Sequence, residues 1–179
     1  MEQSRVILID QLRESSRAFL DSMSMLTPAQ WVWKGRPDRW SVSETAEHVT
    51  AVETGIHRLL TSRILEQPAS AEQRLETEGK DAIVSSAMLD RSAPRLAPER
   101  VRPTGRWATS AETMQRFTES RNGLIAWAEE AEADLRAFSA PHPVFGMLDA
   151  TQWLLFAATH AERHTHQIVE ITEQPDFPV

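Results

Sequence analysis

Residues 149–173 read DATQWLLFAATHAERHTHQIVEITE, and this stretch decides the fold. Its apolar residues and histidines recur three and four positions apart, which is the period of one face of an α-helix. Asp149 and Gln152 have the spacing of an N-cap and N3 pair. We therefore expect a last helix that begins after Asp149 and ends near Glu173. Its inward stripe is predicted to consist of Trp153, Ala157, His160, His164, Gln167, Ile168 and Ile171.

Helical periodicity also covers most of the remaining chain. It predicts three further long helices, over residues 3–26, 42–66 and 110–138. A weaker and more polar helical segment is predicted over residues 71–89. Ser41 and Glu44 form a capping-box pair at the start of the second helix, and Pro68 marks its end. Thr27 and Pro28 combine an N-cap with proline at the first helical position, which predicts a short helical turn.

No window of the chain shows the alternation of a strand bounded by hairpin turns. The Pro141-His142-Pro143 segment is expected to be a loop. Residues 91–106, RSAPRLAPERVRPTGR, contain three prolines and are therefore predicted to form a long crossover connection. These patterns predict an all-α four-helix bundle with a long crossover and short extra helical turns. With no internal repeat and no composition boundary, we expect a single domain over residues 1–179.

Composition excludes several classes of function. The chain has 19 Lys and Arg residues against 26 Asp and Glu residues, a net charge of −7, which disfavours binding to nucleic acid or to a membrane surface. No stretch approaches the length of a transmembrane helix, and the N-terminus does not resemble a signal peptide. We therefore expect a cytoplasmic protein. The absence of cysteine excludes disulfides, thiolate metal sites and a Cys nucleophile, so a metal would bind to His, carboxylate or water.

The histidines are the strongest candidates for a functional site. His160 and His164 lie four residues apart on the inward stripe, a spacing that lets two imidazoles bind one metal ion. His48, on the predicted second helix, can complete a three-ligand set, which leaves coordination positions open as in catalytic metal sites. The alternative is that these histidines are hydrogen-bonded core residues. Burying two imidazoles without partners would cost free energy, which favours the metal.

Two motifs resemble the DinB-like superfamily, which is unrelated to the DNA polymerase of similar name. One is Trp40-Ser-x-x-Glu44-x-x-x-His48, and the other is PHPVFGMLDATQWLLFAATHAERHTHQI at residues 141–168. The resemblance covers nearly the whole chain. It implies a four-helix bundle in which His48, His160 and His164 hold a divalent metal ion, nickel or zinc, with water in the open position. It also implies a homodimer.

The resemblance leads to two functional hypotheses. In the first, the protein is a metal-dependent enzyme that activates a thiol or water for S-transfer or hydrolysis on a small electrophilic substrate. Low-molecular-weight thiols such as bacillithiol or mycothiol serve relatives of this type, and a chain without cysteine would take its sulfur from such a cofactor. In the second, the bundle binds a metal or small ligand in a stress response without catalysis. A third interpretation, a scaffold with structural histidines, predicts no metal.

Five further residues are weighed as site residues. Glu44 could orient a ligand or act as a base, although its capping role already explains it. Gln167 could hydrogen-bond the metal-bound water or satisfy the core. Arg102 and Arg106 would contact the carboxylates of a thiol cofactor if the crossover folds over the bundle mouth, and otherwise belong to a solvated connection. Arg163 could reach an anionic substrate or form a surface ion pair.

Overall fold

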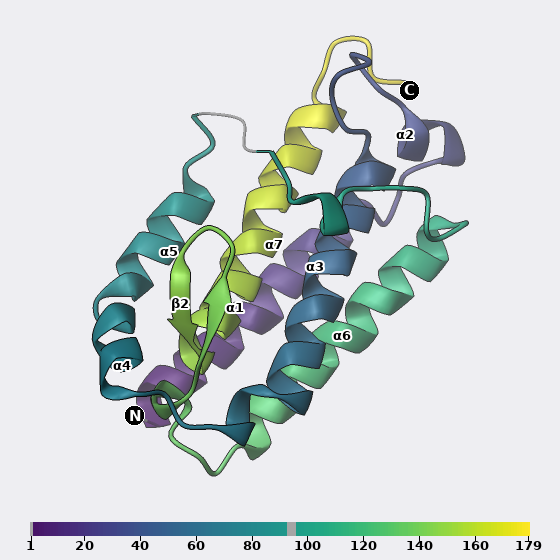
Figure 1. The fold of residues 1–179 in the computed structure, drawn as a ribbon. Coiled ribbons are helices and arrows are strands. Elements are labelled where there is room, and N and C mark those ends of the chain that lie inside the picture. The colour runs from purple at the N-terminus through teal and green to yellow at the C-terminus, as the bar shows by residue number, and fades with distance from the viewer. Residues whose placement is uncertain (1, 93–95) are drawn as a thin grey trace.

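The computed structural model describes residues 2–92 and 96–179, which form a bundle of long helices (Figure 1). In chain order the elements are α1 (Glu2–Asp21), α2 (Pro28–Val32), α3 (Val42–Ser62), the 3₁₀ turn η1 (Ile64–Glu66), α4 (Ala71–Thr77), α5 (Lys80–Leu89), the 3₁₀ turn η2 (Glu99–Val101), α6 (Ser110–Glu130), the 3₁₀ turn η3 (Leu135–Ala137), β1 (Ser139–His142), β2 (Gly146–Asp149) and α7 (Ala150–Thr172).

The four longest of these helices, α1, α3, α6 and α7, form the predicted bundle. Helices α1 and α3 each pack against both α6 and α7, so the four apolar stripes meet along one axis. The core is continuous because each helix contributes fully buried leucine or phenylalanine side chains: Leu12, Phe19, Leu60, Phe117, Leu124 and Leu154. Helix α5 packs against α7 outside this ring. None of the helices in the described part of the chain has the length and hydropathy needed to cross a membrane.

The predicted helix starts are confirmed at the level of individual hydrogen bonds. At the start of α3, the Glu44 backbone N–H donates to Ser41 Oγ and the Ser41 N–H donates to the Glu44 carboxylate. Asp149 and Gln152 make the same reciprocal pair at the start of α7. These bonds satisfy donors that have no partner within the helix. The caps therefore fix the residue at which each site-bearing helix begins.

Four expectations about secondary structure are wrong. Helix α1 ends at Asp21 instead of residue 26. Residues 71–89 form two helices, because Gly79 adopts the left-handed conformation (φ +72°) and breaks the helix between α4 and α5. Helix α6 ends at Glu130 instead of 138, because the next residue, Ala131, takes extended dihedral angles (φ −64°, ψ 114°) as its C-cap. The 141–143 segment belongs to an antiparallel hairpin in which Ser139 pairs with Asp149 and His142 with Gly146. Both strands are only four residues long, and β1 contains Pro141, so they carry no alternation signal.

The crossover segment 91–106 is anchored to the bundle at both ends. One of its arginines, Arg95, lies outside the described residues. Arg91 pairs with Glu170 of α7 at one end. At the other end, the backbone N–H groups of Thr104 and Gly105 donate to the Glu47 carboxylate at 2.7 and 2.8 Å. The guanidinium of Arg106 also pairs with Glu47, at 3.2 Å. The described part of this segment is therefore held against α7 at Arg91 and against α3 at residues 104–106.

Candidate metal centre

Three buried histidines converge between α3 and α7. His48 comes from α3, and His160 and His164 come from successive turns of α7; their exposed fractions are 5, 7 and 6%. One ring nitrogen of each lies within 4.8 Å of those of the other two, and His48 Nε2 is 3.2 Å from His160 Nε2. The structure thus brings together the three residues that the sequence singles out as metal ligands.

The spacing of these nitrogens suits a first-row divalent ion. Metal–nitrogen bonds of about 2.0–2.1 Å in tetrahedral geometry place two ligand nitrogens about 3.3 Å apart. The distance of 3.2 Å between His48 Nε2 and His160 Nε2 agrees with this value. The ring of His164 packs against both of these rings: its centroid is 4.6 Å from that of His160 and 5.0 Å from that of His48. The three ring nitrogens, all within 4.8 Å of one another, are placed to share one ion.

The tautomer of His48 is set by the crossover. His48 Nδ1 lies 2.8 Å from the backbone carbonyl oxygen of Val101, which can only accept a hydrogen bond. The Nδ1 atom therefore carries the proton, and Nε2 of the neutral ring presents a lone pair. A histidine that ligates a metal through one nitrogen typically donates the other N–H to such an acceptor. The Val101 carbonyl thus prepares His48 for ligation through Nε2.

The tautomer of His164 is set by a chain of hydrogen bonds that ends at another carbonyl. Thr45 Oγ1 donates its only proton to the Ser41 carbonyl at 2.8 Å, so it accepts from the Gln167 amide nitrogen at 3.3 Å. This fixes the Gln167 amide with its oxygen toward His164 Nδ1, at 2.9 Å. His164 Nδ1 therefore donates, and its Nε2 presents a lone pair. Two of the three rings are thus held in the ligating tautomer.

Burial keeps the cluster neutral. Desolvation is the main cause that lowers the pKa of His48, His160 and His164 below the usual value for histidine. For His160 the neighbouring histidines lower the pKa further, because a second positive charge would repel the first. A neutral imidazole is the form that binds a metal ion. The cluster therefore does not have to lose protons at neutral pH in order to accept a cation.

The other predicted site residues lie at different distances from the cluster. Gln167 contacts it directly through His164. The Glu44 carboxylate contacts the Ser41 N–H and Lys34 Nζ, both at 2.9 Å, at the start of α3. Gln167 therefore belongs to the surroundings of the histidines, whereas the contacts of Glu44 are those of a helix cap.

The three predicted anion contacts have partners within the protein. Arg163 donates to the Met88 carbonyl at 2.9 Å and to the Asp90 carbonyl, at the C-terminal end of α5. Arg106 pairs with Glu47, and Arg102 donates to the Ala97 carbonyl at 3.0 Å. The positive charge of Arg163 also lowers the pKa of His160 and His164.

His142, expected in a loop, lies at the end of β1 and near the cluster. Its ring packs against Phe156, with centroids 4.5 Å apart, and Phe156 packs against His160 at 5.2 Å. Burial, with the positive charge of Arg100, lowers the pKa of His142 to about 4. The sequence gives no periodic signal for His142, because only the hairpin brings it to α7. The contribution of Val101 is equally hidden, since a backbone carbonyl leaves no signature in side-chain patterns.

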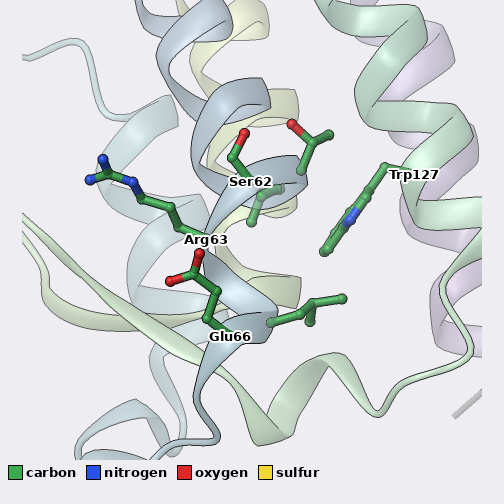
Figure 2. A pocket seen from close by; sticks show the side chains of 7 residues that line it. Ser62, Arg63, Glu66 and Trp127 are labelled. Carbon is green, nitrogen blue, oxygen red and sulfur yellow. The ribbon is translucent and has the colours of Figure 1, made fainter.

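A surface hollow lies far from the histidines. Figure 2 shows side chains around a surface hollow of about 270 Å³ near the C-terminal end of α3, lined by Leu60, Thr61, Ser62, Arg63, Leu65, Glu66 and Trp127. Leu60 is twelve residues beyond His48, or about 18 Å along the helix axis. This hollow therefore takes no part in the histidine centre.

Comparison with known proteins finds a matching family model and a similar bacterial protein. The family model of the DinB superfamily matches residues 9–168, a range that includes the three clustered histidines. The chain is also similar to the uncharacterized protein YuaE of Bacillus subtilis (strain 168). The two are 26% identical over 141 residues, which cover 79% of this chain and 82% of the relative.

Proposed function

Because the chain belongs to the DinB superfamily, we propose that it is a metal-dependent enzyme in which His48, His160 and His164 hold one divalent cation, nickel or zinc. The observation that carries this proposal is the arrangement of protons around the cluster. The Val101 carbonyl and the Gln167 amide oxygen each hold a proton on the outer nitrogen of a histidine. The inner nitrogens of His48 and His164 then present lone pairs, as metal ligands require.

Three protein ligands leave at least one coordination position open, as in catalytic sites. When bound, a divalent ion at such a position supplies Lewis-acid chemistry that makes a nucleophile from water or a thiol near neutral pH. The protein's own residues orient the ligands and keep the surrounding site apolar: the Trp40 ring lies 4.9 Å from that of His48, and the Phe156 ring 5.2 Å from that of His160. Together these features support S-transfer or hydrolysis on a small electrophile.

A low-molecular-weight thiol is the proposed second cofactor if the reaction is S-transfer. The chain itself has no cysteine, so sulfur chemistry at this site would need an external thiol. Bacillithiol and mycothiol are the candidates that the family resemblance supplies. Hydrolysis would need only water. Turnover that requires added thiol would therefore indicate S-transfer, and turnover without thiol would indicate hydrolysis.

The burial of the histidines favours one alternative function. None of the three is more than 7% exposed, so little of the cluster is open to solvent. Such burial suits an ion or a very small ligand better than a bulky substrate. The alternative is a stress-response protein that binds a metal or small ligand without turnover.

Metal content is the first test. The protein, purified without a His tag, should carry about one divalent ion per chain by elemental mass spectrometry. H160A should lose the ion while retaining its helical circular dichroism, whereas H166A should keep it, because His166 is exposed on the same helix. Wild-type protein that is metal-free and cannot be loaded would contradict the proposal. Metal binding without turnover of a chromogenic electrophile, with or without thiol, would favour the binding alternative.

Three expectations from the sequence accompany this proposal. We propose one domain over residues 1–179, a homodimer and a cytoplasmic location. Light scattering of the metal-loaded protein measures the oligomeric state directly.

A further inference from the structure

The surface hollow at the C-terminal end of α3 is separate from the histidine centre, and the proposed function does not use it. It is formed where the last turn of α3 and the turn η1 meet the side chain of Trp127 from α6. Its volume of about 270 Å³ lies just below the usual range of about 300–1,000 Å³ for small-molecule sites. A hollow of this size suits one small ligand.

Trp127 forms an aromatic wall of the hollow. Its side chain is partly buried and packs against the hydrophobic core, which holds the ring in place. Figure 2 shows this ring across the hollow from Ser62 and Glu66, with one face toward them. The face of an indole ring carries partial negative charge and attracts cations more strongly than the other aromatic side chains do. Trp127 therefore presents a cation-binding surface to the hollow.

The last turn of α3 adds a second negative surface. The last carbonyl groups of a helix have no partner within that helix, and they form the negative end of its dipole. The Arg63 backbone N–H caps the carbonyl of Leu59. The next three residues of this turn, Leu60, Thr61 and Ser62, line the hollow, and none of them is basic. The helix end therefore favours a cation beside these three residues.

Glu66 places a full negative charge at the hollow. In the part of the chain that the structure describes, its carboxylate has neither an ion pair nor a hydrogen bond. Arg63 also lines the hollow, but Figure 2 shows its guanidinium directed away from Trp127. The Glu66 carboxylate is therefore available to a ligand. The net charge of −7 on the whole chain adds a long-range attraction for cations.

We propose that this hollow binds a small alkylammonium ion, with its cationic head between the Trp127 ring and the Glu66 carboxylate. Leu65, which is 37% exposed, offers an apolar contact to the alkyl groups. An anion would be repelled by the ring face, the helix end and the Glu66 carboxylate. An uncharged molecule of the same shape would gain from none of these three features. The ligand class is thus an organic cation with apolar groups on its nitrogen.

Nuclear magnetic resonance titration of ¹⁵N-labelled, metal-free protein with choline tests the proposal, because the indole N–H of Trp127 reports directly on the hollow. The uncharged control is 3,3-dimethyl-1-butanol, which has the shape of choline with carbon in place of nitrogen. Both are added at pH 7 and constant ionic strength. We expect saturable shifts of the Trp127 signal with choline only. Equal shifts with the alcohol would overturn the assignment to a cation.

Four variants locate the ligand. E66Q removes an exposed negative charge and should weaken choline binding by about two- to fivefold. W127L removes the indole face and should weaken binding by about two- to fivefold. R63Q removes a like charge beside the ligand and should strengthen binding by about twofold. E162Q changes an exposed glutamate of α7 and should leave the affinity unchanged.

The outcomes decide the proposal without reference to metal binding. Weaker binding in both E66Q and W127L, with unchanged binding in E162Q, supports the site. Affinity that ignores E66Q and W127L overturns it, because the cation then binds elsewhere on an acidic surface. If circular dichroism shows that W127L does not fold, opposite changes of affinity in E66Q and R63Q support the site, and any other combination overturns it. The absence of a saturable shift at Trp127 also overturns it.

Discussion

His48 and Val101 lie 53 residues apart in the chain and are joined by a hydrogen bond of 2.8 Å between the imidazole Nδ1 and the backbone carbonyl. One metal-ligand candidate is therefore oriented by a connection between helices and not by the bundle alone. The same connection is fixed to α3 by Glu47, the residue before His48 in the sequence. Two adjacent residues of α3 thus hold the crossover: Glu47 accepts from its backbone N–H groups, and His48 donates to its Val101 carbonyl. Order in the crossover and orientation of His48 are expected to depend on each other.

Substitution of Glu47 tests this coupling. In E47A the N–H groups of Thr104 and Gly105 lose their acceptor, so their hydrogen exchange should accelerate strongly. Because the Val101 carbonyl is then less firmly held, the affinity for zinc should fall by about tenfold, at the lower end of effects seen for residues that orient ligands. The matched control is E162A, an exposed glutamate of α7. Unchanged exchange at both amides in E47A would show that Glu47 does not anchor the segment.

Gln167 is predicted to tune the metal site through His164. Q167L removes the acceptor of His164 Nδ1–H and frees the ring to rotate, so the affinity for zinc should fall by about 10- to 100-fold. Q167E keeps an acceptor oxygen and should retain most of the affinity. Competition with a chromophoric chelator measures the difference, and Q115L on the exposed surface of α6 serves as control. Equal zinc affinity in wild type and Q167L would assign Gln167 to core packing.

Local sequence rules predicted the bundle and the histidine cluster well, because both depend on helical geometry. The i, i+4 spacing of His160 and His164 and the caps at Ser41 and Asp149 act within one or two turns. These local relations need no knowledge of the remaining chain. His48 lies at the edge of the inward stripe of its helix, and the family resemblance was needed to name it as the third ligand.

The parts that the sequence missed depend on contacts between distant segments. His142 reaches Phe156 only because β1 pairs with β2, and two four-residue strands, one of which contains a proline, give no periodic signal. The role of Val101 rests on its backbone, which is the same for every residue type. The arginines of the crossover have different partners: Arg91 pairs with Glu170, Arg106 pairs with Glu47, and Arg102 donates to the Ala97 carbonyl. Tertiary context therefore decides what each member of a charged segment contacts.

The buried His142 predicts a pH dependence of stability in the metal-free protein. Its pKa is lowered to about 4 by burial and Arg100, against about 6.5 in the unfolded chain. As the pH falls below 6.5 the unfolded state takes up a proton that the folded state refuses, so the stability is lost as the pH falls toward 4. Allowing for solvent screening, we expect a loss of about 1 kcal/mol from His142 between pH 6.5 and 5.

Urea denaturation at pH 7 and pH 5 isolates this contribution. The free energy of unfolding should fall more in wild type than in H142N, by the same amount of about 1 kcal/mol. H166N, which alters an exposed histidine, should behave like wild type. The window above pH 5 avoids most carboxylate titration. A wild type and an H142N variant that lose equal stability would refute the depressed pKa.

Arg121 is predicted to be the most sensitive polar residue of the core. Its side chain is 0% exposed, and its guanidinium forms the ion pair with Glu53 of α3. It also donates to the Leu12 carbonyl and Ser15 Oγ of α1, at 2.6 and 2.8 Å, and to the Ala157 carbonyl of α7 at 3.1 Å. One side chain of α6 thus connects all four long helices. The Ala157 carbonyl lies one turn before His160, so the same contacts hold the region of α7 that carries the cluster.

Removal of only one partner of this pair should cost more stability than removal of both. R121M leaves the Glu53 carboxylate buried without a counter-charge, which is expected to destabilise the fold by about 3–5 kcal/mol in urea denaturation. The double variant R121M/E53M replaces both charges by apolar groups of similar length and should recover much of that loss. Where R121M remains folded it should still bind one metal ion per chain, because Arg121 holds the backbone and not the imidazoles. A double variant that is less stable than R121M would mean that the remaining contacts of Glu53 and Arg121, and not the unpaired charge, dominate the stability of this core.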